Sequence, residues 1–248
     1  MSVIKGAVLA LAIQIFSLSA LAAERWVVTT LEWPPFTCSR CPENGAAAKA
    51  LKDTLKTVGV SVEFVFYPWT QAIKRGERPE VVGFFPVWPE TFRPGFSPSH
   101  LLFRSPLGII QQRSKPLVWS KLSDLKGKKI GITEGYGNTV EFNRLVKEKI
   151  LKVEAVKSDD TNLRKVALGQ LDGALMDINN ARYLMHVTHP KLAGRVSVSP
   201  RIVQDKDHFF AFNIHNKAKV DKLNKALANV NYQRIVDDYL LKYMRRLD

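Results

Sequence analysis

Aromatic side chains beside prolines are the residues of this sequence best suited to holding a small molecule. They form three clusters, Trp33-Pro34-Pro35-Phe36, Tyr67-Pro68-Trp69 and Phe84-Phe85-Pro86-Val87-Trp88, and each follows a segment with the pattern of a strand. Ligands of parallel α/β sheets lie beyond the carboxyl ends of the strands. The three clusters are therefore predicted to line one concave pocket. Phe84 and Phe85 suit a core position equally well.

Catalytic and metal-binding motifs are absent from the sequence. There is no G-x-S-x-G, no P-loop and no H-E-x-x-H. His186 and His189 are three residues apart, a spacing that can bind a metal on a helix. No acid or thiol motif accompanies them, so a solvated helix end before Pro190 is favoured. We predict no metal, no cofactor and no enzymatic activity.

The two cysteines form the segment Cys38-Ser39-Arg40-Cys41. A zinc knuckle would need two further ligands at a recognisable spacing, and none is present. A redox pair would open a helix after a strand, whereas this segment follows Pro34 and Pro35 in a predicted loop. Disulfides persist in exported proteins. We predict a short structural disulfide between Cys38 and Cys41.

The charge balance is strongly basic. The 248 residues include 37 Lys and Arg against 23 Asp and Glu, a formal net charge of +14. The field of such a chain favours anions. The basic residues are dispersed, and no nucleic-acid-binding pattern occurs, so a nucleic-acid partner is not predicted. With 46% hydrophobic and 24% charged residues, the chain has the composition of a globular protein.

Residues 1–23 have the pattern of a secretory signal peptide. Lys5 precedes an apolar run from Gly6 to Phe16, and Ala20-Leu21-Ala22 forms a small-residue cleavage site. The alternative is an uncleaved anchor helix, but the run has only marginal length and Gln14 interrupts it. We predict an exported, periplasmic protein whose mature chain begins near Glu24.

Strand-like and helix-like segments alternate through the rest of the chain, which predicts an α/β protein with largely parallel sheets. The predicted strands are Trp26–Thr30, Ser61–Tyr67, Val81–Phe85, Lys128–Thr133, Gly173–Met176 and His208–Ile214. The predicted helices are Ala47–Val58, Trp69–Arg75, a helix from Asn138 and a helical segment from Lys217 to the end.

Four motifs resemble those of the family 3 extracellular solute-binding proteins, the polar amino-acid type of ABC-transporter receptors. In chain order they are Trp33-Pro34-Pro35-Phe36, Phe96-Ser97-Pro98 followed by Leu101-Leu102-Phe103, the stretch from Leu122 to Ile132 (LSDLKGKKIGI), and the stretch from Leu168 to Asp177 (LGQLDGALMD). The second-lobe entry, LSDLKGKKIGI, is the most specific of the four. The resemblance covers nearly the whole mature chain.

The resemblance implies a two-lobe clamp of the periplasmic-binding-protein type II fold. Lobe 1 would comprise residues 24–110 with 214–248, and lobe 2 residues 111–213. Two crossover strands, Leu107–Gln112 and His208–Asn213, would join them. The implied function is capture of a small polar or amino-acid-like solute for an ABC-type permease, by a monomer. The alternatives are a ligand-sensing module without transport and a periplasmic dehydratase-like enzyme on the same scaffold.

The resemblance also implies ligand contacts. The candidates are Trp33, Phe36, Trp69, Trp88, Arg93, Tyr136, Asn138, Thr139 and Asp177. Asp177 matches the acid that holds an α-amino group, with capping of the next helix as its alternative role; Asn138 has the same alternative. Arg93 is the nearest match to the family's carboxylate-binding arginine but lies closer to Phe96-Ser97 than usual. Ala46-Ala47-Ala48 stands where an aspartate is common, and these departures argue against a standard amino acid. The many aromatic residues suit a larger or more apolar solute.

Overall fold

The computed structural model describes residues 24–244. The predicted signal peptide, residues 1–23, lies outside the described residues. The strands are β1 (Glu24–Thr30), β2 (Val60–Phe66), β3 (Gly83–Val87), β4 (Phe96–Pro98), β5 (Phe103–Gln112), β6 (Lys129–Thr133), β7 (Lys152–Val156), β8 (Gly173–Asp177) and β9 (Val196–Asn213). The α-helices are α1 (Ala46–Lys56), α2 (Trp69–Gly76), α3 (Val140–Lys147), α4 (Asp159–Ala167), α5 (Ile178–Tyr183), α6 (Lys217–Leu227) and α7 (Tyr232–Met244).

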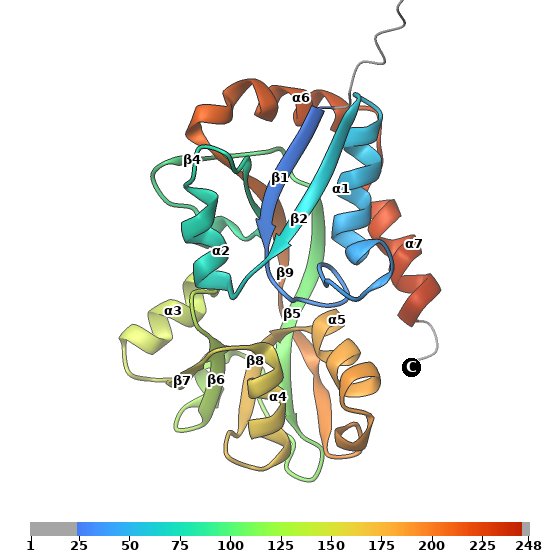
Figure 1. Ribbon diagram of the computed structural model, residues 1–248. Coiled ribbons are helices and arrows are strands. Elements are labelled where there is room, and N and C mark those ends of the chain that lie inside the picture. The colour runs from blue at the N-terminus through green and yellow to red at the C-terminus, as the bar shows by residue number, and fades with distance from the viewer. Residues whose placement is uncertain (1–23, 245–248) are drawn as a thin grey trace, which may run out of the picture.

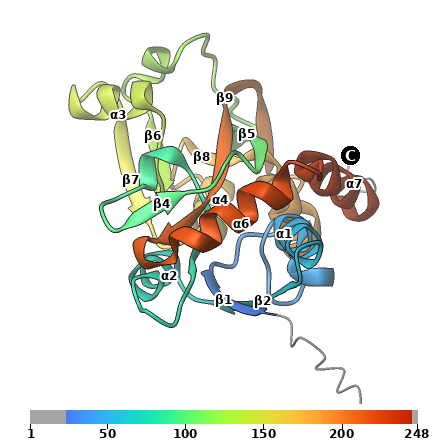
Figure 2. The same cartoon turned by 90° about the horizontal axis from the view of Figure 1, so that it is seen from above.

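The elements form two lobes joined by two long strands (Figure 1). One lobe holds β1, β2 and β3 with α1, α2, α6 and α7, and the other holds β6, β7 and β8 with α3, α4 and α5. Seen from above, α6 and α7 lie beside α1, so the C-terminal helices return to the lobe of the N-terminal strands (Figure 2). The predicted α/β clamp is confirmed.

The sheet is parallel inside each lobe and antiparallel where the lobes join. Strand β1 pairs in parallel with β2 and β3, and β6 pairs in parallel with β7 and β8. Strand β9 pairs antiparallel with β3 at one end and with β5 along most of its length. Because β9 is 18 residues long, one unbroken strand passes from lobe to lobe.

Both connecting strands are longer than the sequence predicts. The predicted crossovers Leu107–Gln112 and His208–Asn213 lie within β5 and β9, but β9 begins twelve residues earlier, at Val196. Its first part contains a proline and several charged residues, which hide the strand pattern. Pairing with β5 forms the strand nonetheless. The predicted C-terminal helical segment is two helices, α6 and α7.

The start of α1 explains why three alanines follow Gly45. The amide of Ala46 donates to the Pro35 carbonyl at 2.7 Å and that of Ala47 donates to the Phe36 carbonyl at 3.0 Å. Gly45 has φ +100°, and a Cβ there would lie 2.6 Å from the Phe36 carbonyl oxygen. The first turn of α1 therefore closes against the loop that carries Trp33, and small residues are required there.

Helices of the second lobe begin at side-chain caps. The Thr139 hydroxyl accepts from the Phe142 amide at 3.1 Å, and the Ser158 hydroxyl accepts from the Thr161 amide at 3.2 Å. The sequence places the start of the first of these helices at Asn138, whereas α3 begins at Val140, because the capping hydroxyl belongs to Thr139. No helix between residues 24 and 244 has the length and apolar character that a membrane crossing needs.

Candidate ligand-binding cleft

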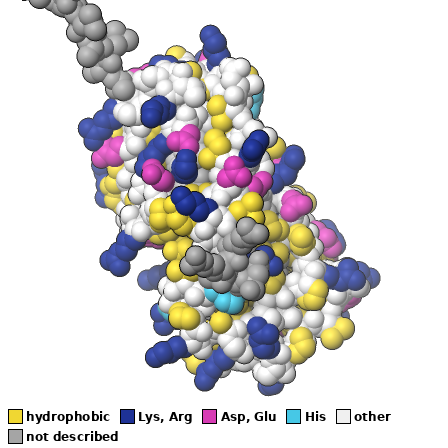
Figure 3. All heavy atoms as spheres, turned by 90° about the vertical axis from the view of Figure 1, so that its right-hand side faces the viewer, with side chains coloured by type: hydrophobic (Ala, Val, Ile, Leu, Met, Phe, Trp, Pro, Cys, Tyr) yellow, Lys and Arg dark blue, Asp and Glu magenta, His cyan; other side chains and the backbone are white. Residues whose placement is uncertain are grey.

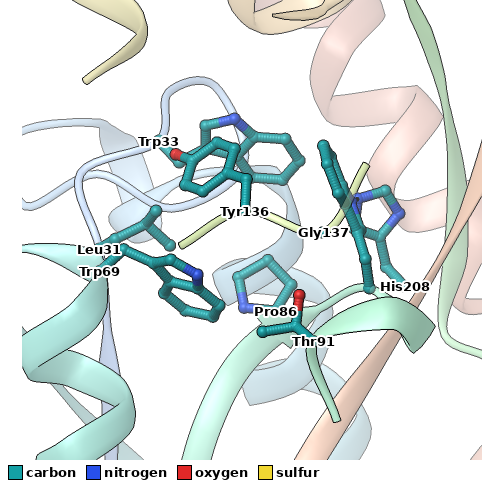
Figure 4. Close-up of a pocket in the computed structure, with 9 residues that line it drawn as sticks. Leu31, Trp33, Trp69, Pro86, Thr91, Tyr136, Gly137 and His208 are labelled. Atoms are coloured by element: carbon teal, nitrogen blue, oxygen red, sulfur yellow. Dashed lines mark hydrogen bonds between the residues drawn. The ribbon is translucent and has the colours of Figure 1, made fainter. Parts of the chain in front are cut away.

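The three predicted aromatic clusters meet at one hollow between the lobes, as Figure 4 shows. This inner hollow encloses about 290 Å³, counting its open mouth. Its walls consist of Leu31, Trp33, Trp69, Pro86, Trp88, Thr91, Tyr136, Gly137 and His208. Trp33, Trp69 and Trp88 come from three strand ends of the first lobe, whereas Tyr136 comes from the loop between β6 and α3.

Each tryptophan of the inner hollow rests on a ring of the core. Trp33 stacks on Phe36 with centroids 4.5 Å apart, and Trp69 meets Phe84 edge-on at 5.5 Å. Phe36 is fully buried and lines no hollow, so it supports Trp33 from behind. Such stacking fixes the rings before any ligand arrives.

His208 positions the third tryptophan. Its Nε2 accepts a hydrogen bond from Trp88 Nε1 at 2.5 Å, and its ring stacks on Phe103 with centroids 4.2 Å apart. Burial lowers the pKa of His208 to about 3, so the ring is neutral at physiological pH. The sequence analysis missed His208 because a lone histidine in a strand carries no signal of the rings around it.

An ion pair between a buried lysine and a partly exposed glutamate lies behind Trp88. Lys206 Nζ is 2.5 Å from a Glu90 carboxylate oxygen and 5.0 Å from the centre of the Trp88 ring. Lys206 is 1% exposed, so its charge is neutralised by Glu90 rather than by water. The inner hollow therefore has an uncharged lining.

The lobes touch around this hollow. Trp69 Nε1 donates to the Gly135 carbonyl at 3.0 Å, and the rings of Trp69 and Trp88 meet the Tyr136 ring edge-on, with centroids 6.3 and 5.7 Å apart. Gly137 approaches the first lobe so closely that a Cβ there would lie 2.9 Å from Glu90 Cβ. The structure is thus a closed form of the clamp.

A second, outer hollow adjoins the inner one and encloses about 1510 Å³, its open mouth included. The two share Leu31, Trp69 and Tyr136. The outer hollow also has polar walls: Glu32, Arg40, Thr133, Lys157, Asp159, Asp160 and Asn180. Together the two hollows form a cleft that is aromatic inside and that carries polar side chains among apolar ones in its outer part.

Asp159 is the buried acid of the outer hollow. It is 6% exposed, and its Oδ1 accepts from the Thr133 hydroxyl at 2.8 Å. Its Oδ2 is buried and has no hydrogen-bond partner. Burial raises the pKa of Asp159 to about 6, against the opposing effect of three hydrogen-bond donors beside it, the Thr133 and Tyr136 hydroxyls and the Trp33 indole. Asn180 Oδ1 and Trp33 Nε1 are also buried without a partner.

Asp177 occupies a different kind of place. Its Oδ1 accepts from the Asn180 amide at 2.9 Å, which caps α5, and its Oδ2 is bonded to the Ser105 hydroxyl. It is 2% exposed and lines neither hollow, and burial raises its pKa to about 7. Of the two roles that the sequence left open, the structure shows the helix cap.

Other predicted site residues lie outside the lining. Arg93 is exposed, because the neighbouring Phe92 turns inward against Phe209 and the extended chain points Arg93 the opposite way. Thr139 caps α3, and Asn138 lies beside it; neither lines a hollow. The structure thus brings together Trp33, Trp69, Trp88 and Tyr136 but not Arg93, Asn138 or Thr139.

The predicted disulfide between Cys38 and Cys41 is confirmed. It closes a short turn at the edge of the outer hollow, which Cys38 lines. Cys41 Sγ lies 3.7 Å from the Tyr183 hydroxyl of the opposite lobe. His189 contacts the Asp160 carboxylate rather than His186. The two histidines therefore do not form a metal-binding pair in this structure.

The fold is shared with solved structures of known proteins. A histidine kinase sensor domain similar to periplasmic binding proteins aligns at a TM-score of 0.73, with 17% identity over 88% of this chain and 97% of that one. An ancestral arginine-binding protein aligns at 0.72, with 21% identity over 90% and 99%. An arginine transport-system binding protein from Legionella pneumophila aligns at 0.70, with 20% identity over 87% and 99%.

This chain has the two-lobed fold of the periplasmic binding proteins. No family model matches its sequence, and no curated protein does. Identities near 20% establish the fold alone. In these folds the cleft between the lobes is where a ligand is held, and the two hollows occupy that place here.

Proposed function

We propose that this protein is an exported solute-binding protein of the family 3 type, which captures a small solute between its lobes and delivers it to an ABC-type permease. The observation that carries the proposal is the inner hollow, where tryptophans from three strand ends of one lobe face Tyr136 of the other. A hollow with an uncharged aromatic lining can bind and release a small solute. Such binding requires no catalytic group. Binding proteins of amino-acid transport share the fold.

The proposal includes the remaining parts of the family pattern. Lobe 1 would be residues 24–110 with 214–248, and lobe 2 residues 111–213. The chain would be secreted through a cleaved signal peptide, would act in the periplasm as a monomer, and would catalyse no reaction. A dispersed basic surface, with acids among the Lys and Arg side chains (Figure 3), suits a protein that makes no nucleic-acid contact.

Sensing is the second candidate function. A histidine kinase sensor domain has the same fold, with nearly its entire length covered by the alignment. A sensory role would use the same cleft and the same closure, with a membrane receptor in place of a permease. A screen of binding partners separates the two roles, because only a transport role requires a permease contact.

A thermal-shift screen of amino acids, peptides, amines and organic acids tests the proposed function. A solute that binds only the folded protein stabilises it by mass action, by about 2.7 kcal/mol at a concentration 100-fold above Kd. We expect at least one class of small solute to raise Tm in this way. Failure of every class, together with the absence of any co-purified small molecule by native mass spectrometry, would contradict the proposal.

Gly137→Val links binding to closure of the lobes. A side chain at position 137 would collide with Glu90 and Thr91 of the opposite lobe. Overpacking of this kind costs about 1–3 kcal/mol, so the affinity for the solute should fall roughly tenfold to a hundredfold. Gly194→Val is the matched control, because open space surrounds position 194. Equal affinities for the two variants would show that the solute binds elsewhere.

A further inference from the structure

Two buried hydrogen-bond acceptors of the outer hollow have no donor. One is Oδ2 of Asp159, a residue that is only 6% exposed, and the other is Asn180 Oδ1. The orientation of the Asn180 amide is fixed, because its Nδ2 donates to the Pro34 carbonyl at 2.5 Å and only an NH₂ group can do so. Buried acceptors that lack a donor are rare and costly in folded proteins. A ligand that brings N–H groups would complete both.

A ligand carboxylate, in contrast, finds no cationic partner inside the cleft. Among the residues that line the two hollows, the basic side chains are Arg40 and Lys157, and both are exposed at the rim. His208 is buried and neutral, and Lys206 is already paired with Glu90. A carboxylate near the inner hollow would be repelled by the Asp159 carboxylate, and no cation there would offset this repulsion.

The two hollows share one continuous wall. Leu31, Trp69 and Tyr136 belong to both, so a molecule with its charged end in the outer hollow reaches the aromatic inner hollow directly. Trp33 lines the inner hollow and lies close enough to Asp159 to affect its pKa. Indole and phenol faces attract cations as well as apolar groups.

We propose that the solute is an organic amine with an apolar or aromatic body and no carboxylate, whose ammonium group donates to Asp159 and Asn180. The inference rests on the proposed function and refines it. An ammonium group has three donors and no acceptor, which matches two unpaired acceptors and a negative charge. The acid that holds the amine is then Asp159, and Asp177 remains a structural cap.

Calorimetric titration with matched sets of probes tests the ligand class. One set is tryptamine, tryptophan and indole-3-propionate; the others are tyramine with tyrosine and phenethylamine with phenylalanine. We expect at least one amine to bind at least about tenfold more tightly than its amino acid, and the acid to show no binding. Tighter binding of an amino acid or of the acid would overturn the inference.

Variants of the two buried acids test the assignment. Asp159→Asn should weaken binding of the amine roughly tenfold to a hundredfold, since it removes a charged hydrogen-bond partner. Asp177→Asn should leave the affinity within about threefold, because both of its oxygens are already bonded inside the protein. Loss of binding in Asp177→Asn with retention in Asp159→Asn would overturn the assignment.

The outcomes separate this inference from the proposed function. If none of the probes binds, the solute found in the broad thermal-shift screen decides: an amine without a carboxylate upholds the inference, and any other class overturns it while the binding function stands. A broad screen without any ligand contradicts the binding function itself.

Discussion

The two walls of the cleft are built by different means. The wall of the first lobe consists of Trp33, Trp69 and Trp88, each supported by a ring or histidine of the core behind it. The wall of the second lobe carries polar groups at the ends of strands, and two of them, on Asp159 and Asn180, are left unpaired. Folding alone fixes the rings of the first wall, although Trp33 Nε1 is left without an acceptor, whereas the unpaired groups of the second wall are acceptors, which a ligand would complete by supplying donors.

The aromatic wall sets the shape of the cleft, whereas the polar wall carries its charge. Because the aromatic wall is continuous with the core, a change there should alter stability and binding together. Because the polar wall carries a buried carboxylate without a donor, removing its charge should stabilise the empty protein while harming binding, as is common at functional sites. The predictions below sharpen that contrast.

Trp33→Ala should have the largest effect. Trp33 is 4% exposed and stacked on Phe36, so its removal leaves a cavity at the junction of core and cleft. Large-to-small changes of aromatic core residues cost about 3–5 kcal/mol. We expect chemical denaturation to show a loss of this size, accompanied by loss of the ligand-induced Tm shift. A variant that is as stable as the wild type would mean that the aromatic wall is not continuous with the core.

Asp159→Asn should stabilise the empty protein at high pH. Because the folded pKa of Asp159 is raised to about 6, the folded state holds the proton more tightly than the unfolded state, and ionisation opposes folding. This destabilisation by ionised Asp159 is absent below pH ~4 and complete above pH ~7. The pKa differs by about two units between the folded and unfolded states, which corresponds to roughly 3 kcal/mol. The asparagine can still accept from Thr133 through Oδ1.

Denaturation curves of wild type and Asp159→Asn at pH 4 and pH 8 check this expectation. The variant should be more stable at pH 8, and the two proteins should be nearly equal at pH 4. The groups that face Asp159 are Thr133, Tyr136, Trp33 and the Asp177 carboxyl, which becomes easier to ionise once Asp159 is neutral. A variant less stable than the wild type at pH 8 would show that the charge of Asp159 supports the fold.

Trp69→Phe should have the smallest effect. The phenylalanine retains a ring against Phe84 and loses the hydrogen bond from Nε1 to the Gly135 carbonyl of the other lobe. A hydrogen bond of this kind is worth about 0.5–1.5 kcal/mol, so affinity should fall up to about tenfold. Trp119→Phe is the control, because Trp119 donates to Ser199 away from the cleft. An equal loss of affinity in both variants would show that the Trp69 hydrogen bond does not help to close the clamp.

The aromatic wall could be predicted from the sequence because its signals are local. Trp33, Trp69 and Trp88 each stand beside or near a proline just after a strand, and the topology of a parallel sheet brings such points together. The polar wall has a weaker signal in the sequence. Ser158-Asp159-Asp160 has the pattern of a helix start, but the Tyr136 and Trp33 side chains that lie beside Asp159 come from distant parts of the sequence.

Two further residues show why motif resemblance has limits. Arg93 falls near the position expected for a carboxylate-binding arginine, yet packing of Phe92 on Phe209 directs it outward. Lys206 belongs to a segment whose charges hide a strand, and only pairing with β5 and Glu90 buries it. In both cases contacts between distant segments decide which way the side chain faces.

Hydrogen exchange with and without the bound solute tests the central claim most directly, namely that one solute contacts both walls of the cleft at once. We expect slower exchange in segments of both lobes, around residues 31–36 and 67–72 in the first and 133–139 and 157–162 in the second. Slower exchange confined to one lobe, or located away from these segments, would contradict a clamp that closes on its ligand.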